Sequence, residues 1–210
     1  MRHAARVCLL ILSVPVLWLA SPPHGGHPTA GAQEAQTQTR ETKTPDVIFV
    51  PTPQEVVDKM LELAEVKEGD LVYDLGCGDG RIPVTAAKKY GVKAVGFDVD
   101  PQRIKESNAN VEKNGVGKLV TIKQEDIFKQ DLSKANVVTL YLLPSLNVKL
   151  MPQLMKLKPG SRIVSHSFDM RGAKPKKVVQ VQTKSGGEHS VYLWVVPWEK
   201  EQQEPDHEPQ

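Results

Sequence analysis

The sequence is 210 residues long, which is enough for one folded domain with an ordinary hydrophobic core. Its formal net charge is +2, and it falls to 0 if residues 1–32 are removed, because that segment contains two arginines and no acidic residue. A chain so close to neutral gives no electrostatic reason to expect a nucleic-acid partner. Removal would also take Cys8 and leave Cys77 as the remaining cysteine, which excludes an intramolecular disulfide.

The N-terminal segment has the layout of a secretory signal peptide. Arg2 and Arg6 precede an uncharged apolar run over 7–20, and Ala30–Ala32 has the small-residue pattern of a cleavage site. We therefore predict a signal peptide over 1–32 and export to the periplasm or the exterior. The apolar run is shorter than the about 20 residues that a membrane-spanning helix needs, so no stable span is expected. An uncleaved N-terminal membrane anchor is the alternative.

The segment 33–46 is polar, rich in Gln and Thr, and lacks apolar periodicity, so it is predicted to be a disordered linker. The folded domain is predicted over 47–198. Near its start, Thr52 can cap a helix and Glu55 can close the capping box. The helix itself is indicated by apolar residues at helical spacing: Val56, Val57, Met60, Leu61 and Leu63.

The segment 71–81 predicts a strand, a tight glycine turn and the start of a helix. An apolar run ends near Asp74, and Gly76, Gly78 and Gly80 follow at alternate positions. Glycines permit unusual backbone angles and let a ligand approach the backbone closely. The spacing differs from the G-x-G-x-x-G of dinucleotide sites, and Asp74 would repel a pyrophosphate but attract an ammonium group. The loop is therefore predicted to hold a ligand that bears an ammonium.

A second carboxylate follows the next predicted strand, 94–98. Asp98 lies about twenty residues beyond the glycine loop, where an acidic residue of nucleoside-binding α/β folds accepts hydrogen bonds from the ribose hydroxyls. Asp100 is a competing candidate, and it can also cap the helix that opens with Pro101.

Five predicted strands with four intervening helices indicate a doubly wound parallel sheet. The fourth strand, within 135–144, is almost continuously apolar, as expected of a central strand that is covered on both faces. Ser145 can cap the helix that follows it. The fifth strand is predicted over 163–168.

The end of the domain predicts two further strands, over 178–183 and 191–196, with a glycine-containing turn between them. Their separation is short, so we expect an antiparallel hairpin at the sheet edge. The expected fold class is therefore α/β: a doubly wound, mostly parallel seven-strand sheet with an antiparallel C-terminal hairpin. Residues 199–210 are predicted to be a disordered acidic tail.

Residues 72–80, Val-Tyr-Asp-Leu-Gly-Cys-Gly-Asp-Gly, resemble the first motif of class I, or seven-strand, S-adenosylmethionine (SAM) methyltransferases. The resemblance covers roughly residues 51–198, and it implies a Rossmann-like fold and SAM as the cofactor. It places the following residues at the cofactor: Asp74, Gly76, Cys77, Gly78, Gly80 and Asp98. Cys77 reads more simply as a small side chain that fits a tight turn than as a nucleophile.

The resemblance also implies an adenine contact after the third strand. In that family an acidic residue there contacts the adenine amino group, and the backbone of the next residue lies near the ring. Asp126 and Ile127 occupy the corresponding positions. Glu125 is the alternative to Asp126, and Asp126 can instead cap a short turn before Phe128.

The end of the fourth strand bears on the methyl acceptor. Methyltransferases of adenine or glutamine amides have an Asn/Asp-Pro-Pro-aromatic turn there, and this chain has Leu140-Tyr-Leu-Leu-Pro144 instead. The chain resembles a lysine-specific group of protein methyltransferases more closely, which implies a protein substrate. Tyr141 can orient an amine and His166 can accept a proton, although both residue types also occur in such strands as structural residues.

We therefore expect a SAM-dependent methyltransferase, with a protein lysine amine as the acceptor. The alternatives are a small-molecule methyltransferase and a non-catalytic SAM-binding or nucleoside-binding module. No metal is expected, because no His/Cys/Asp cluster has ligand spacing in the sequence. The sequence does not predict an oligomeric state.

Overall fold

The computed structural model describes residues 48–201. The predicted signal peptide over 1–32, the linker over 33–46 and the last part of the tail, 202–210, lie outside the described residues. Within the described range, no helix is long and apolar enough to cross a membrane.

Helices and strands alternate along the described residues as far as β5, and two further strands follow without a helix. The elements are α1 (Gln54–Leu63), β1 (Leu71–Leu75), α2 (Arg81–Tyr90), β2 (Lys93–Asp98), α3 (Pro101–Lys113), β3 (Val120–Gln124), the short 3-10 helix η1 (Ile127–Lys129), β4 (Val137–Leu140), α4 (Pro144–Leu154), β5 (Arg162–His166), β6 (Lys177–Gln182) and β7 (Glu188–Val195).

The strands form one seven-stranded sheet in the order β3-β2-β1-β4-β5-β7-β6. The first five strands are parallel, and β7 runs antiparallel to both β5 and β6. The predicted fold class, including the antiparallel hairpin at the edge, is confirmed. The strand order reverses between β1 and β4, and ligands of open α/β sheets bind at the carboxyl ends of the strands beside such a reversal.

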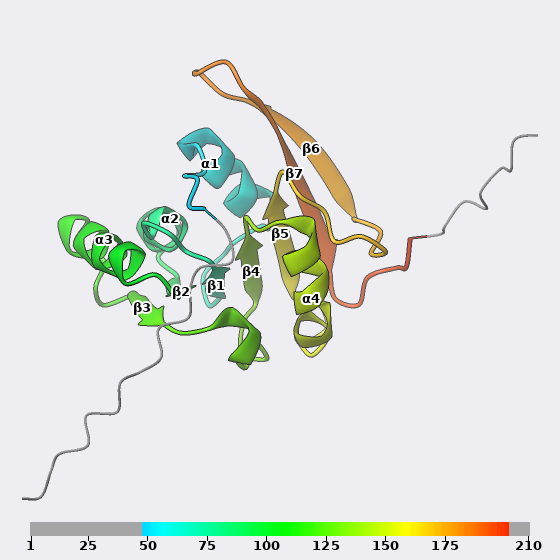
Figure 1. Cartoon of the computed structure of the whole chain (residues 1–210), viewed down its shortest axis with the longest axis horizontal. Helices are drawn as coiled ribbons and strands as arrows, with labels where there is room; N and C mark the ends of the chain where they lie inside the picture. Colours follow the sequence, from blue (N-terminus) through cyan, green and yellow to red (C-terminus); the bar gives the residue numbers. More distant parts are fainter. Residues whose placement is uncertain (1–47, 202–210) are drawn as a thin grey trace, which may run out of the picture. The chain divides into compact units, whose positions relative to one another are not determined.

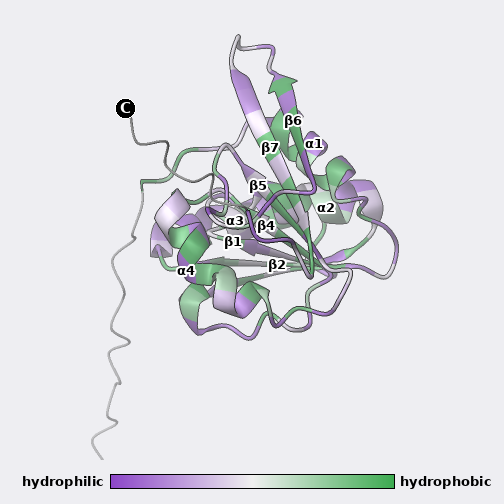
Figure 2. Ribbon diagram, turned by 90° about the vertical axis from the view of Figure 1, so that its right-hand side faces the viewer, coloured by the Kyte–Doolittle hydropathy of each residue, from purple (hydrophilic) through white to green (hydrophobic). Residues whose placement is uncertain are grey.

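Helices cover both faces of the sheet (Figure 1). One core cluster joins α1, α2 and α3 to the sheet, and a second joins α4 and η1 to the opposite face. Figure 2 shows hydrophobic segments on α1 and α4 and hydrophilic stretches in the loops. The central strand β4 is buried at all of its positions, which explains its continuous run of apolar residues.

Three local predictions are wrong. Only the short 3-10 helix η1 lies between β3 and β4, so three α-helices and not four lie between the first five strands. Thr52 does not cap α1, because Pro53 occupies the N-cap and the Thr52 hydroxyl lies against His166 instead. Ser145 does not cap α4, since the helix begins one residue earlier at Pro144, whose ring already fixes the backbone angle of a first helical residue.

The beginning of the predicted acidic tail is ordered. Lys200 forms an isolated β-bridge with Ala173, and the Glu201 amide donates to the Gly172 carbonyl at 3.1 Å. Lys174 pairs with Glu199 at 3.1 Å. The loop after β5 therefore provides backbone partners that the composition of the tail does not reveal.

Candidate active site

A pocket of about 800 Å³ lies at the carboxyl ends of β1, β2 and β4, beside the reversal of strand order. This volume is within the range of small-molecule sites. The pocket brings together most of the predicted site residues: Asp74, Gly76, Cys77, Asp98, Asp126, Ile127 and Tyr141. Gly78, Gly80 and His166 are not among the residues that line it.

The glycine loop adopts backbone angles that disfavour other residues. Gly76, Gly78 and Gly80 have φ values of 82°, 53° and 75°, and this left-handed region is costly for a residue with a Cβ. The amides of Gly76 and Cys77 both donate to the Phe97 carbonyl at 2.9 Å. The loop is thus fixed to the end of β2, with its backbone at the pocket.

Cys77 behaves as a packing residue of this loop. Its side chain is buried, and burial raises the pKa of the thiol well above the usual value. Its Sγ lies 3.8 Å from the Ser107 hydroxyl. A thiol that stays protonated is a weak nucleophile, so the structural reading of Cys77 is the one that its surroundings favour.

Asp74 is the most unusual charged group in the pocket. It is 2% exposed, and burial raises its pKa from 3.8 to about 7, although a hydrogen bond from Thr139 at 2.7 Å opposes the rise. Nearby Asp98 and Asp79 raise it further. Its second oxygen, Oδ2, is buried without a hydrogen-bond partner. A cationic group at that oxygen would supply both the missing partner and the missing charge.

Asp98 accepts hydrogen bonds from the glycine loop and from the loop that follows β2. Its Oδ2 accepts from the Gly78 amide at 2.9 Å, and its Oδ1 accepts from the Asp100 amide at 3.0 Å. Each carboxylate oxygen can accept a further hydrogen bond, so Asp98 retains capacity for ribose hydroxyls. Asp100 also lines the pocket, but its Oδ1 caps α3 through the Gln102 amide at 2.8 Å and its Oδ2 lies 3.8 Å from Arg103.

Asp126 and Ile127 lie side by side on the pocket wall, at the start of η1. Asp126 caps this helix, because its Oδ1 accepts from the Phe128 amide at 3.0 Å. Ile127 is buried and packs in the core beneath the pocket. Asp126 therefore caps the short turn, as the alternative predicted, and it also lines the pocket. Glu125, the other candidate, does not line it.

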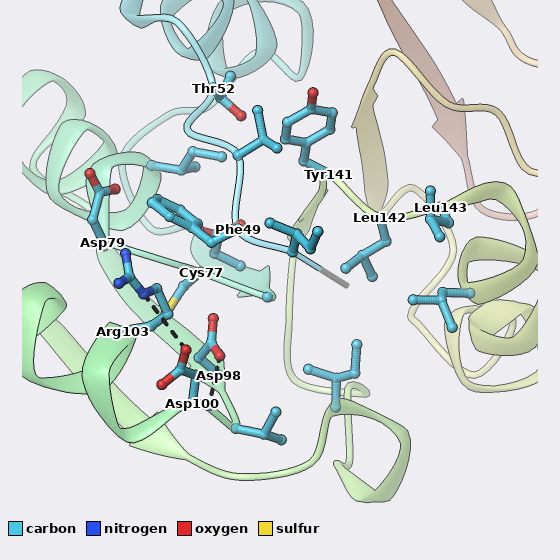
Figure 3. A pocket seen from close by; sticks show the side chains of 18 of the residues that line it. Phe49, Thr52, Cys77, Asp79, Asp98, Asp100, Arg103, Tyr141, Leu142 and Leu143 are labelled. Atoms are coloured by element: carbon cyan, nitrogen blue, oxygen red, sulfur yellow. Dashed lines mark hydrogen bonds and ion pairs between the residues drawn. The ribbon is translucent and has the colours of Figure 1, made fainter. Parts of the chain in front are cut away.

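The segment 48–52, here called the entry strap, also lines the pocket, and the sequence prediction missed it. Figure 3 shows Phe49 in the middle of the pocket, between Asp79 and Arg103 on one side and Leu142 on the other. The guanidinium of Arg103 lies 4.6 Å from the centre of the Phe49 ring. No local pattern marks these residues, since Phe49 belongs to an irregular segment and Arg103 to a polar helix.

Two contacts fix the entry strap to the glycine loop. The Phe49 ring packs so closely on Gly78 that a Cβ there would lie 2.1 Å from a ring carbon. Arg81 donates to the Thr52 carbonyl at 2.7 Å and pairs with Asp79 at 2.5 Å. Gly78 is therefore required for a side-chain contact as well as for its backbone angle.

The two predicted catalytic residues are neighbours, but only Tyr141 reaches the pocket. Its ring lies 3.9 Å, centre to centre, from the ring of His166 and 6.0 Å from that of Phe168. His166 is fully buried behind it. Burial, together with the nearby His189, lowers the pKa of His166 to about 4. His166 therefore cannot contact a substrate in the pocket directly.

The side of the pocket that follows β4 and β5 is apolar. It is formed by Leu142, Leu143, Leu146 and Phe168. The buried Asn147 holds the loop after β5, because its amide donates to the carbonyls of Asp169 at 3.0 Å and Phe168 at 3.3 Å. Within residues 48–201, no group of three or more His, Cys, Asp or Glu side chains is arranged to hold a metal ion.

The residues present fit SAM. The orphaned, buried oxygen of Asp74 suits its ammonium, Asp98 suits its ribose, and Asp126 with Ile127 suits its adenine. The glycine loop contributes Gly76, Cys77 and Asp79 to the lining of the same pocket.

Comparisons with known proteins agree with this geometry. A family model described as the ANTKMT methyltransferase domain matches residues 74–177. A protein-lysine N-methyltransferase of Saccharolobus islandicus (strain REY15A) is 51% identical over 154 residues, which cover 72% of this chain and 95% of that protein. Ribosomal protein L11 methyltransferase of Enterobacter sp. (strain 638) is 40% identical over 75 residues, 34% of this chain and 26% of that protein.

A solved structure extends the likeness to three dimensions. The crystal structure of an RNA methyltransferase from Salinibacter ruber, in complex with S-adenosyl-L-homocysteine, has a TM-score of 0.66 and 49% identity, and the match covers 70% of this chain and 94% of that chain. Sequence, fold and pocket lead to one assignment: the chain belongs to the class I SAM-dependent methyltransferases, in the group of the protein-lysine methyltransferases, and SAM is its cofactor.

Proposed function

We propose that this methyltransferase acts on the ε-amine of a lysine in a protein. The observation that supports this most strongly is the 51% identity to a protein-lysine N-methyltransferase along 95% of that protein. When bound, SAM would supply an electrophilic methyl group, and its thioether would be the leaving group. The chain itself must hold the amine and the methyl in contact, and such positioning accounts for about 7 to 11 kcal/mol of barrier lowering in well-oriented reactions.

The apolar wall suits a lysine side chain. Leu142, Leu143 and Phe168 can pack along its four methylene groups. An apolar environment also disfavours the ammonium form, so it lowers the pKa of the amine and increases the fraction that is neutral and nucleophilic. A neutral amine is what the transfer requires.

Tyr141 is the residue best placed to orient the amine. It directly follows β4 at the pocket, and its ring contacts that of His166 and lies near that of Phe168. Burial raises the pKa of the Tyr141 hydroxyl, so the hydroxyl stays protonated and can donate or accept one hydrogen bond at neutral pH. It can therefore accept a hydrogen bond from an amine N–H and direct the lone pair.

RNA is the second candidate acceptor. One observation favours it, namely the 49% identity to a protein described as an RNA methyltransferase. The net charge of +2 provides little attraction for a polyanion. The end of β4 also lacks the Asn/Asp-Pro-Pro-aromatic turn of adenine amino methyltransferases, as Leu140 to Pro144 show.

The test is to incubate the purified chain with methyl-labelled SAM and a cell extract, and then to digest the products. Label that is sensitive to protease and resistant to ribonuclease, and that co-elutes with methyl-lysine after acid hydrolysis, is the expected result. Label that ribonuclease removes would contradict the proposal and identify RNA as the acceptor. Asp74→Asn serves as the control for label that does not depend on the cofactor site.

A further inference from the structure

A line of hydrogen bonds leads from the pocket wall to the hairpin formed by β6 and β7. Thr52 lines the pocket and is 4% exposed, and its Oγ1 lies 3.2 Å from Nδ1 of His166. Nε2 of His166 lies 2.9 Å from Nδ1 of His189. His189 is partly exposed on β7, so the line begins in the pocket and ends near solvent.

The fold explains why these residues meet. His166 is the last residue of β5, and it pairs with Val191 of the antiparallel neighbour β7. His189 lies two residues earlier on β7, so both side chains point to the same face of the sheet. Thr52 ends the entry strap and precedes Pro53, the N-cap of α1, and α1 belongs to the core cluster on that face. Figure 3 shows Thr52 beside Tyr141 at one end of the pocket.

We propose that Thr52, His166 and His189 form a proton relay, which moves the proton lost by the acceptor amine from the pocket to solvent. This inference rests on the proposed lysine acceptor, because an ammonium must lose a proton before its nitrogen can attack. Among the described residues, the apolar wall beside Tyr141 contains no titratable side chain for this task, since Leu142, Leu143, Leu146 and Phe168 form it.

The protonation state of His166 suits a relay. Its pKa of about 4 keeps the ring neutral at physiological pH, and a neutral ring accepts at one nitrogen while it donates from the other. The titratable groups in contact with it are Tyr141 from the end of β4 and His189 from β7. Glu55, on α1, is engaged elsewhere, since its carboxylate accepts from the Lys184 amide at 3.4 Å.

The transfers balance. At rest, the Thr52 hydroxyl donates to Nδ1 of His166, and Nε2–H of His166 donates to Nδ1 of His189. The amine gives its proton to the Thr52 oxygen as the hydroxyl proton passes to Nδ1 of His166. The Nε2 proton of His166 then moves to Nδ1 of His189, whose own Nε2 proton leaves to water. One proton enters the line and one leaves it. After product release, Nε2 of His189 takes up a proton from water, the transfers run in reverse, and the Thr52 hydroxyl gives a proton to a water in the pocket, which restores the starting tautomers.

Variants of His189 separate proton transfer from hydrogen bonding. His189→Asn places an amide oxygen near the position of Nδ1, so it retains an acceptor for His166 but cannot pass on a proton. His189→Ala leaves a space at a partly exposed position, which free imidazole can fill. Ser190→Ala is the matched control on β7, because the Ser190 hydroxyl bonds Gln180 at 3.0 Å and lies outside the relay.

The measurement is the rate at which label from SAM enters extract protein, together with melting temperature and SAM affinity. We expect both His189 variants to lose at least about tenfold in rate with unchanged melting temperature and SAM affinity. Imidazole should restore much of the rate of His189→Ala. Ser190→Ala should keep the wild-type rate with and without imidazole. Thr52→Val should be slow as well, and Thr52→Ser should retain more of the rate.

If the wild type labels protein, two results would overturn the relay and leave the lysine assignment intact. One is an unchanged rate in both His189 variants. The other is a reduced rate that imidazole does not restore in His189→Ala, because His189 would then only support the hairpin. A wild type that labels no protein would overturn the lysine assignment, and the relay with it.

Discussion

SAM affinity should fall as pH falls, because Asp74 must be ionised to attract the ammonium. With a pKa of about 7, the free carboxyl is about half ionised at pH 7 and about one hundredth ionised at pH 5. An α-amino group, with a pKa near 7.7 to 8.0, stays protonated over that interval. The affinity should therefore be about fiftyfold weaker at pH 5 than at pH 7, and binding at the lower pH should release a proton from Asp74.

Isothermal titration calorimetry of SAM at pH 5, 6 and 7 measures this dependence, and buffers of different ionisation enthalpy count the released proton. Asp74→Asn keeps the shape of the side chain and an oxygen for Thr139, so its affinity should be weak at pH 7 and nearly independent of pH. His166 does not interfere, because its pKa of about 4 lies below the interval. A wild-type affinity that does not change from pH 7 to pH 5 would refute the reasoning, and so would wild-type affinity in Asp74→Asn at pH 7.

The same substitution should stabilise the ligand-free chain. The pKa of Asp74 is 3.8 unperturbed and about 7 in the fold, so the fold binds this proton more tightly than the unfolded chain does. The ionised carboxylate then lowers the free energy of unfolding as pH rises above 3.8, and the full cost, on the order of 4 kcal/mol, is present above pH 7. Asp74→Asn should melt higher than wild type at pH 8, with the difference vanishing near pH 4. A lower melting temperature at pH 8 would mean that Asp74 is needed for the turn itself.

Three further substitutions address the rest of the pocket. Thr139→Val removes the hydrogen bond that favours ionised Asp74, so the midpoint of the affinity profile should move up by about one pH unit or more; an unmoved midpoint in calorimetry would contradict this. Asp98→Ala should weaken SAM binding roughly ten- to hundredfold and also lower the melting temperature, because two loop amides lose their acceptor; unchanged affinity would exclude Asp98 as the ribose ligand. Gly78→Ala should lower the free energy of unfolding by about 1 to 2 kcal/mol, and adding Phe49→Ala should recover part of that loss in denaturant titrations. An equal loss in the single and the double variant would show that the ring contact contributes nothing.

The sequence was sufficient for the sheet and for one side of the pocket. Parallel strands bring their carboxyl ends to one edge of a sheet, so residues that follow separate strands, such as Asp74, Asp98 and Asp126, must lie near one another once the strands are recognised. The prediction needed only local patterns and this rule. The structure brings the residues that the strands themselves position together at one pocket.

Contacts between irregular segments could not be predicted in this way. Phe49 reaches the pocket from a stretch without periodicity, and nothing in the neighbouring sequence indicates that it packs on Gly78. Thr52 has the spacing of a helix cap, yet its hydroxyl faces His166, which is 114 positions away in the chain. The partnership of His166 with His189 depends on the register of an antiparallel pair, and a one-residue shift would point the two side chains to opposite faces.

The entry strap has a practical consequence for how this protein is cut into expressible pieces. The family match spans residues 74–177, and a clone with those boundaries would contain the glycine loop and every carboxylate of the cofactor pocket. It would lack Phe49 and Thr52 on one side and the whole of β7 on the other. Such a fragment would lose one wall of the cavity, all of β6 except Lys177, and the first three residues of the central strand β1. A clone made for biochemical work should therefore begin before Ile48 and extend past Glu201, the last described residue, whose amide donates to the Gly172 carbonyl in the loop after β5.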